Sequence, residues 1–424
     1  MNLLFKTLQV FIVRGFGAAA GFLMSLVVTN TTELHYAGVF FFALAMVQLG
    51  GGLMTLGSTN ALLKVVGSDY GTCWYRINQD TSFILKAVFV LAILVGTSSL
   101  LIPNKITQWL GIPELAAFLP LVVAGMLLFC LIQIFAEIIQ GKQNAVMAAT
   151  VHNVIAQFSF IVLLGLLFWL TIEQTSSTLT SVYVLALSIA TGIGAYAWFS
   201  TQGARFEFTA RLSSDLKASL APLFVIMLMN QCAQWAGQFA TAKYLSSSDV
   251  AFFASAQRTA TLASFVLIAV NLVVAPKFAQ AFAKGRQGDV NKLSLLSSRL
   301  MMLLATPVLL FMIFLPEFLM GLFGEEYKVA APLLQILAVG QFVNVITGSV
   351  GYLLNMTGHE KDMRNVVLFS GPLAIALALG LTSQFGLMGA AYATAISVAT
   401  QNLLAVWMVK KRLGFNTLNV FRKV

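Results

Sequence analysis

The sequence predicts an all-α, polytopic membrane protein with about twelve transmembrane helices, and three observations lead to this prediction. Of the 424 residues, 59% are hydrophobic and only 9% are charged, whereas a soluble domain is about 25% charged. The mean hydropathy is +0.88. Apolar runs of about 20 residues, enough to cross a bilayer, recur along the whole chain. So few polar side chains cannot cover a water-soluble domain of this size, which excludes a cytosolic enzyme.

Hydropathy places six candidate spans in each half of the chain. In the first half they are 9–29, 36–58, 83–103, 115–138, 148–169 and 179–199. In the second half they are 217–240, 249–275, 295–315, 329–353, 364–383 and 388–408. The first span resembles a secretory signal, because Lys6 precedes apolar residues. Arg14 interrupts that run, which continues to about Thr29, so we expect a retained helix, with cleavage as the alternative.

The distribution of basic residues predicts the orientation. The net charge is +10, and cytoplasmic loops collect Lys and Arg. Almost every basic residue in a loop lies on the side that holds the N-terminus, whereas the opposite side has Lys105, Lys243 and Lys328. We therefore expect both termini to be cytoplasmic in a multi-pass protein of the cell inner membrane. Because topology explains the excess charge, no nucleic-acid partner is expected.

Two pairs of similar segments indicate an internal duplication. Gly38–Ala43, which opens the second span, resembles Ala251–Ala256, which opens the eighth. The turn Gln140–Gln143 after the fourth span resembles Thr357–Glu360 after the tenth. Both intervals are close to half of the chain. The pattern predicts two pseudo-symmetric six-helix lobes of the same topology, residues 1–204 and 205–424, and a linker over 205–217.

Arginines at membrane depth are the main candidates for function, because charges there are expensive and tend to mark a substrate path. Arg258 lies about 12 Å inside the eighth span. Ser255 and Thr261, one turn on either side, extend a polar stripe. We expect Arg258 to face a cavity and bind an anion; the alternative is a structural role with hydrogen bonds to helix carbonyls. Arg14 lies roughly 8 Å inside the first span, where substrate binding and snorkelling to the interface are both open.

Amide side chains are concentrated in the seventh span. These are Asn230, Gln231, Gln234 and Gln238, of which the first, third and fourth share one helix face. We interpret them as the lining of a wet cavity, with interhelical bonding as the alternative. Simple interhelical hydrogen bonds are expected from five other polar residues: His152, Asn153, Gln157, Gln341 and Asn344.

Other classes of site are disfavoured by what the sequence lacks. No acidic residue falls in the middle of a predicted span, and Glu137 comes closest, which favours an anionic substrate over a cationic one. The cysteines (Cys73, Cys130, Cys232) and histidines (His35, His152, His359) are scattered, so no metal site is expected. No ATP-binding loop is present, and we expect no cofactor. The basic segment 277–292 is explained as a topology determinant, with contact to anionic lipid headgroups as the alternative.

Several segments resemble the polysaccharide-transporter, or Wzx-like oligosaccharide flippase, branch of the multidrug/oligosaccharidyl-lipid/polysaccharide exporter superfamily. The resemblance covers nearly the whole chain. Its carriers are Tyr36–Phe40, Gln140–Lys142, Asp249–Phe253, Ala256–Arg258, Leu322–Tyr327, Gly358 and Phe385–Ala391. These are diffuse patterns, so they identify the superfamily better than the substrate.

The resemblance implies two lobes around a central cavity that opens to each side in turn. It implies transport of an oligosaccharide linked to polyprenyl diphosphate, as in O-antigen or other surface polysaccharide synthesis, from the cytoplasmic to the outer leaflet. In such flippases the first, second, seventh and eighth helices line the cavity, and basic residues there meet the diphosphate; Arg14 and Arg258 lie on two of these helices. Membrane lipid, a polysaccharide polymerase and a chain-length regulator are the further partners implied.

Besides a pure scaffold role, which the polar stripes disfavour, two other functions stay open from the sequence alone. One is a multidrug/cation antiporter of the same superfamily, which the lack of deep carboxylates disfavours. The other is a membrane glycan polymerase or ligase. Such an enzyme usually carries catalytic groups in a sizeable outer loop, and the longest outer stretches here, 104–114 and 316–328, are short. We therefore expect a transporter and no catalytic residues.

Overall fold

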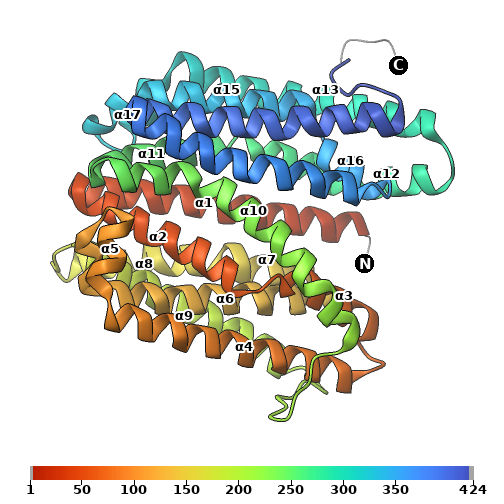
Figure 1. Ribbon diagram of the computed structural model, residues 1–424, viewed down its shortest axis with the longest axis horizontal. Coiled ribbons are helices and arrows are strands. Elements are labelled where there is room, and N and C mark those ends of the chain that lie inside the picture. The colour runs from red at the N-terminus through yellow and green to blue at the C-terminus, as the bar shows by residue number, and fades with distance from the viewer. Residues whose placement is uncertain (1–2, 420–424) are drawn as a thin grey trace. The chain divides into compact units, whose positions relative to one another are not determined.

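The computed structural model describes residues 3–419, and within this range the chain is helical with no strand (Figure 1). Ten of its helical segments are long and apolar enough to cross a membrane. One of them, Glu360–Leu413, contains the two last predicted spans, and α10 contains the seventh. The prediction of an all-α polytopic membrane protein is confirmed.

The first predicted lobe begins with α1 (Leu3–Thr31), and its other helices follow in short succession. They are α2 (Leu34–Met54), α3 (Ser58–Asp69), α4 (Trp74–Leu101), α5 (Pro103–Leu110), η1 (Pro113–Phe118), α6 (Leu119–Gly141), α7 (Ala145–Asn153), α8 (Ile155–Trp169) and α9 (Ser176–Phe199).

The remaining helices begin after the linker. They are α10 (Ser214–Tyr244), α11 (Ser247–Thr261), α12 (Ser264–Ala283), α13 (Gln287–Phe314), α14 (Pro316–Gly321), η2 (Glu325–Ala330), α15 (Ala331–Thr347), α16 (Val350–Met356) and α17 (Glu360–Leu413).

Three spans predicted as single helices are each divided in two. The fifth is α7 and α8, the eighth is α11 and α12, and the tenth is α15 and α16. At the last division Gly348 has a φ of 75°, and a side chain there would collide with Ser298. The hydropathy pattern runs unbroken through all three divisions, so it could not have located them.

The helices repeat in the same order in the two halves of the chain. A 28-residue helix, α4 or α13, is followed by a short helix that begins with proline, α5 or α14. A 3₁₀ helix, η1 or η2, then leads into a long buried helix, α6 or α15. The interval between the members of each pair is constant to within one residue. This succession supports the duplication that the sequence predicts.

The described chain divides into two compact units, one through Gln231 and one from Cys232. In the N-terminal unit α6 packs against α2, α3, α4 and α9, and in the C-terminal unit α15 packs against α11, α13 and α17. The two central helices are members of one repeat pair. The division lies inside α10, further along the chain than the lobe boundary predicted at residue 204, which stays a prediction.

The long helix α17 is a hairpin of two antiparallel helices, seen as two blue helices in Figure 1. Gly386 is non-helical, with φ 58° and ψ −139°. On either side of it the chain pairs with itself: Ser370 Oγ lies 3.3 Å from Gln401 Oε1. Near the open end, Arg412 forms a two-bond ion pair with Asp362, at 2.7 and 2.8 Å. The predicted spans 364–383 and 388–408 fall on the two arms.

The linker is held against α4 by side chains of that helix. Asn78 donates to the Gly203 carbonyl at 2.9 Å and accepts from the Arg205 amide at 3.0 Å. Ser82 accepts from the Glu207 amide at 2.9 Å, and Lys86 donates to the Phe208 carbonyl at 2.7 Å. The backbone of an irregular segment is thereby satisfied by one helix face.

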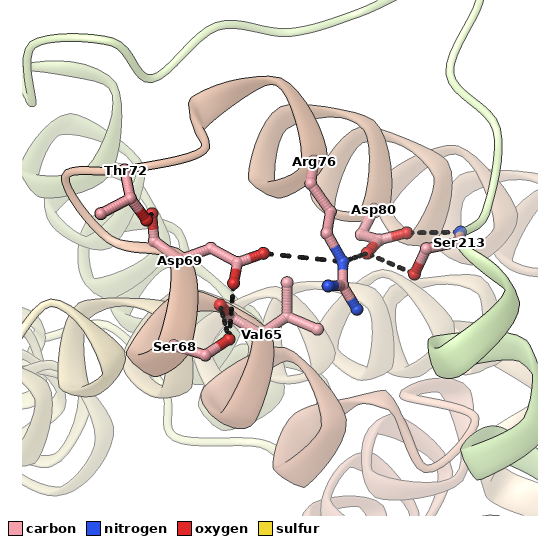
Figure 2. Close-up of polar contacts among 7 residues, drawn as sticks. All are labelled: Val65, Ser68, Asp69, Thr72, Arg76, Asp80 and Ser213. Carbon is pink, nitrogen blue, oxygen red and sulfur yellow. Dashed lines mark hydrogen bonds and ion pairs between the residues drawn. The ribbon is translucent and has the colours of Figure 1, made fainter.

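Asp80 ends this series of contacts and is fully buried. Figure 2 shows its carboxylate accepting from both the amide and the hydroxyl of Ser213, at 2.7 and 2.8 Å. Arg76 lies between two carboxylates, with Nε 3.6 Å from Asp69 and 3.9 Å from Asp80. The third predicted span begins at residue 83, so Asp80 was expected just outside it. The helix α4 begins nine residues earlier, at Trp74, and includes Asp80.

Candidate functional site

Arg14, the first predicted site residue, lies in α1 and is half-buried. Its Nε is buried and has no hydrogen-bond partner in the part of the chain that the structure describes. The guanidinium interacts electrostatically with Glu137 of α6 and with His152 of α7. Arg14 therefore faces the packed interior of the N-terminal unit.

Close helix packing places Arg14 beside α7. A side chain at Gly17 would come within 2.5 Å of the Asn153 carbonyl oxygen, so α1 can approach α7 this closely only with glycine at this position. One turn further, Gly21 faces Gln157 of α8. Gly50 and Gly51 have the same effect in α2, where a side chain at either position would collide with Met126 of α6.

Several polar groups around Arg14 retain free hydrogen-bonding capacity. The Gln157 Oε1 atom is buried without a partner among the described residues. His152 Nδ1 lies 3.2 Å from Asn153 Oδ1, and Asn153 donates to the Ala149 carbonyl at 3.0 Å. These bonds run within α7, not between helices as expected. We call Arg14, Glu137, His152, Asn153 and Gln157 the Arg14 cluster; it combines one fixed cation with a carboxyl group, an imidazole and two amides.

The amides of α10 do not form one uniform face. Asn230 and Gln234 are exposed, whereas Gln238 is 2% exposed. Gln231 donates to the Gln48 carbonyl at 3.5 Å and lies against Gly52. The Gln234 carbonyl accepts from Gln257 of α11 at 3.2 Å. Of the four, only Asn230 and Gln234 present accessible side chains to a ligand in this structure.

The polar stripe of the eighth span occupies α11. A capping box of Ser246 and Asp249 starts the helix, and Arg258 lies in its last turn. Ser255 is fully buried, Arg258 is half-buried, and Thr261 is exposed and donates to the Gln257 carbonyl at 2.7 Å. Arg258 has an interaction partner within the chain. A cation at a helix C-terminus is stabilised by the carbonyls there, so this position suits the structural alternative as well as anion binding.

Two features of the site were missed from the sequence. The proximity of Glu137 and His152 to Arg14 depends on how α1, α6 and α7 pack, and no local pattern encodes it. The sequence did contain an indication that Asp80 is engaged by a partner, because Arg76 lies one helical turn before it at the spacing of an ion pair. The prediction for Gln341 is confirmed: its Oε1 accepts from Ser264 Oγ of α12 at 2.8 Å.

The chain shares its fold with known multi-pass membrane transporters. A multidrug resistance MATE family transporter of the MOP superfamily, in an inward-facing conformation, matches with a TM-score of 0.77 and 14% identity over 97% of this chain and 98% of that one. The lipid II flippase MurJ, in an inward closed conformation, matches with a TM-score of 0.77 and 15% identity over 98% and 91%. The MATE multidrug transporter DinF-BH has a TM-score of 0.71 and 18% identity over 99% and 97%.

Sequence comparisons agree with this class. Residues 222–380 match the MatE family. A probable low-salt glycan biosynthesis flippase of Haloferax volcanii is 30% identical over 165 residues, which are 38% of this chain and 34% of the relative. An uncharacterised membrane protein of Methanocaldococcus jannaschii is 25% identical over 170 residues, 39% of this chain and 32% of the relative. The matches thus span about a third of each relative.

Proposed function

We propose that the protein is a flippase that moves polyprenyl-diphosphate-linked oligosaccharide from the cytoplasmic to the outer leaflet by alternating access. The observation that carries the proposal is the Arg14 cluster, in which a guanidinium is held inside a membrane helix bundle with a donor that no described residue satisfies. A membrane-buried arginine with spare hydrogen-bonding capacity suits an anionic group.

The chemistry of the cargo fits the arginines of α1 and α11 and the amides of α10. A planar guanidinium can engage phosphate oxygens in a fork, which a lysine cannot do as well. Exposed amides such as Asn230 and Gln234 offer donors and acceptors to sugar hydroxyls. The lipid tail needs no protein cavity, since it can remain in the bilayer. Outward movement of an anion gains about 2.3 kcal/mol per charge for each 100 mV of inside-negative potential.

Two proteins named as flippases support this cargo class. The lipid II flippase shares the fold, and the Haloferax volcanii relative is named for glycan biosynthesis. By extension, a polysaccharide polymerase and a chain-length regulator would act on the same product, and the protein would reside in the inner membrane with both termini cytoplasmic.

A multidrug/cation antiporter is the second candidate, because MATE transporters share the fold equally well. Such a protein needs an accessible carboxylate for its cationic cargo. Three acidic groups on the helices have partners within the chain: Glu137 interacts with Arg14, Asp80 accepts from Ser213, and Asp362 pairs with Arg412. These pairings favour the anionic cargo.

The test is transport of a fluorescent polyprenyl-diphosphate-linked sugar in proteoliposomes. Arg14→Ala should lower the initial rate by roughly 10- to 100-fold, the range expected for loss of a charged hydrogen bond of about 1.5–3 kcal/mol. Arg14→Lys should recover only part of the rate, because it keeps the charge and loses the fork. The initial rate of Arg258→Ala tests the second predicted arginine in the same way.

The matched control is Lys64→Ala, which removes an exposed positive charge on α3. It should transport at the wild-type rate. Wild-type transport by both Arg14→Ala and Arg258→Ala, at equal reconstitution, would contradict the proposal. Uptake of a cationic dye that requires neither arginine would favour the antiporter.

A further inference from the structure

A strongly basic cavity lies between α12 and α13, apart from the Arg14 cluster. Its volume is about 560 Å³. Five cationic side chains and one anionic side chain line it: Lys277, Lys284, Arg286, Lys292, Arg299 and Asp289. Asp289 cannot balance five positive charges. Its carboxylate lies 3.9 Å from Arg286, and both side chains are exposed.

The cavity is built by two antiparallel helices that bring their basic faces together. Lys277 on α12 and Lys284 directly after its end are seven residues apart, and on α13 Lys292 and Arg299 have the same spacing. A tight turn at Gly285, with φ 69°, joins the helices. Like charges in this arrangement repel one another, so the cavity is most stable with an anion inside.

Apolar side chains continue the cavity along α13. Leu293 and Leu296 form part of its wall, and Leu296 is 62% exposed. Leu300 and Leu303 follow on the same face of the helix and are also exposed. Positive charges at one end of an exposed leucine stripe match an amphiphile with an anionic head and an apolar tail. A free anion would not need the stripe.

The position in the membrane agrees with a lipid. The apolar part of α13 is predicted to begin near residue 295, so Leu296 lies at the hydrocarbon boundary and the lysines lie outside it on the predicted cytoplasmic side. This is where the phosphates of a bilayer are found.

We propose that this cavity binds the headgroup of a resident anionic phospholipid, with an acyl chain lying along Leu296, Leu300 and Leu303. The lipid would neutralise the facing helices and fix the α12–α13 hairpin to the cytoplasmic leaflet. The site is independent of the transported cargo.

The experiment compares lipid binding by the full-length protein in nanodiscs, using spin-labelled phosphatidylglycerol and spin-labelled phosphatidylcholine. Wild-type protein should immobilise phosphatidylglycerol preferentially. The triple variant Lys277→Gln, Lys284→Gln, Lys292→Gln should weaken that preference by at least about tenfold, because each lysine near a bilayer surface contributes about a factor of five. The preference should also decline with ionic strength.

The control carries the same change in net charge elsewhere: Lys64→Gln, Lys361→Gln, Lys410→Gln, all exposed. Equal loss in both triple variants would overturn the site, because the preference would then be a general charge effect. Absence of any preference in the wild type would do the same. If substoichiometric polyprenyl diphosphate displaces the phosphatidylglycerol, the cavity belongs to the cargo and the resident-lipid proposal is wrong. Lys284→Glu alone provides a second, milder variant, with size-exclusion chromatography confirming that each protein is folded.

Discussion

At the scale of single residues, the balance between Arg14 and its neighbours decides what the cluster can bind. Glu137 is half-buried and interacts with the guanidinium, so it competes with any anionic ligand for the same positive charge. A cation with its own carboxylate nearby binds an anion more weakly than an isolated one would. If Arg14 binds the cargo as proposed, we expect Glu137 to weaken that binding and to favour release.

Removing this competing charge should tighten binding. Glu137→Gln is expected to raise the affinity for polyprenyl diphosphate by about fivefold, corresponding to about 1 kcal/mol for a partly screened ion pair. Slower transport should accompany it, since release becomes limiting. Affinity measured by microscale thermophoresis in detergent, with the exposed Glu317→Gln of α14 as the control, checks this. A loss of affinity instead would mean that Glu137 positions Arg14.

The sequence identified Arg14 and Arg258 because a charge within an apolar run is conspicuous without any knowledge of packing. The sequence could not identify which side chains surround either arginine. Glu137, which interacts with Arg14, lies on a different helix. Ser255, expected on a polar stripe, is fully buried, and its hydroxyl has no partner among the described residues. Burial of a small polar side chain depends on which face a neighbouring helix covers, and hydropathy averages over faces.

At the scale of elements, α4 has two separate roles along its length. Its first four turns carry the polar residues that hold the linker, from Asn78 to Lys86, and the rest is an apolar span. The hydropathy average therefore placed the start of this span late, at residue 83. The breaks in the fifth, eighth and tenth spans are likewise invisible to composition, and at the tenth the backbone of Gly348 leaves the helical region with a φ of 75°.

Asp80 should be the most sensitive residue of the linker contacts. Asp80→Ala leaves the half-buried amide and hydroxyl of Ser213 without an acceptor, at a cost of about 1–3 kcal/mol. The apparent Tm of Asp80→Ala in detergent should fall by several degrees. The Tm of Asp80→Asn should fall less, because one acceptor oxygen remains. Asp289→Ala, an exposed carboxylate 3.9 Å from Arg286, should melt like the wild type. An unchanged Tm for Asp80→Ala would show that Ser213 finds another partner.

At the scale of the whole molecule, the repeated order of helices is the main organising feature. Two short segment pairs predicted it from the sequence, although Phe and Ala are common throughout the chain. The structure strengthens it through further paired elements, such as the 3₁₀ helices η1 and η2. Secondary structure retains the duplication better than side chains do, because many apolar residues can fill the same helix position.

The predicted topology is testable on the complete protein. In a background where the three cysteines are serine, Gln287→Cys should react with a membrane-impermeant maleimide only in inside-out vesicles. Glu173→Cys, in the loop between α8 and α9, should react only in intact cells. The asymmetry follows from the distribution of Lys and Arg. The reverse labelling pattern would place both termini outside and would invert the proposed direction of transport.

The hairpin formed by α17 has a consequence for how the protein is made. Its two arms are joined at one non-helical residue, Gly386, and their register is fixed by pairs such as Asp362 with Arg412. Because this connection is so short, the second arm cannot remain outside the membrane while the first arm inserts. During synthesis both arms should leave the translocon together, and the ribosome should release Arg412 before the ion pair that locks the finished hairpin can form.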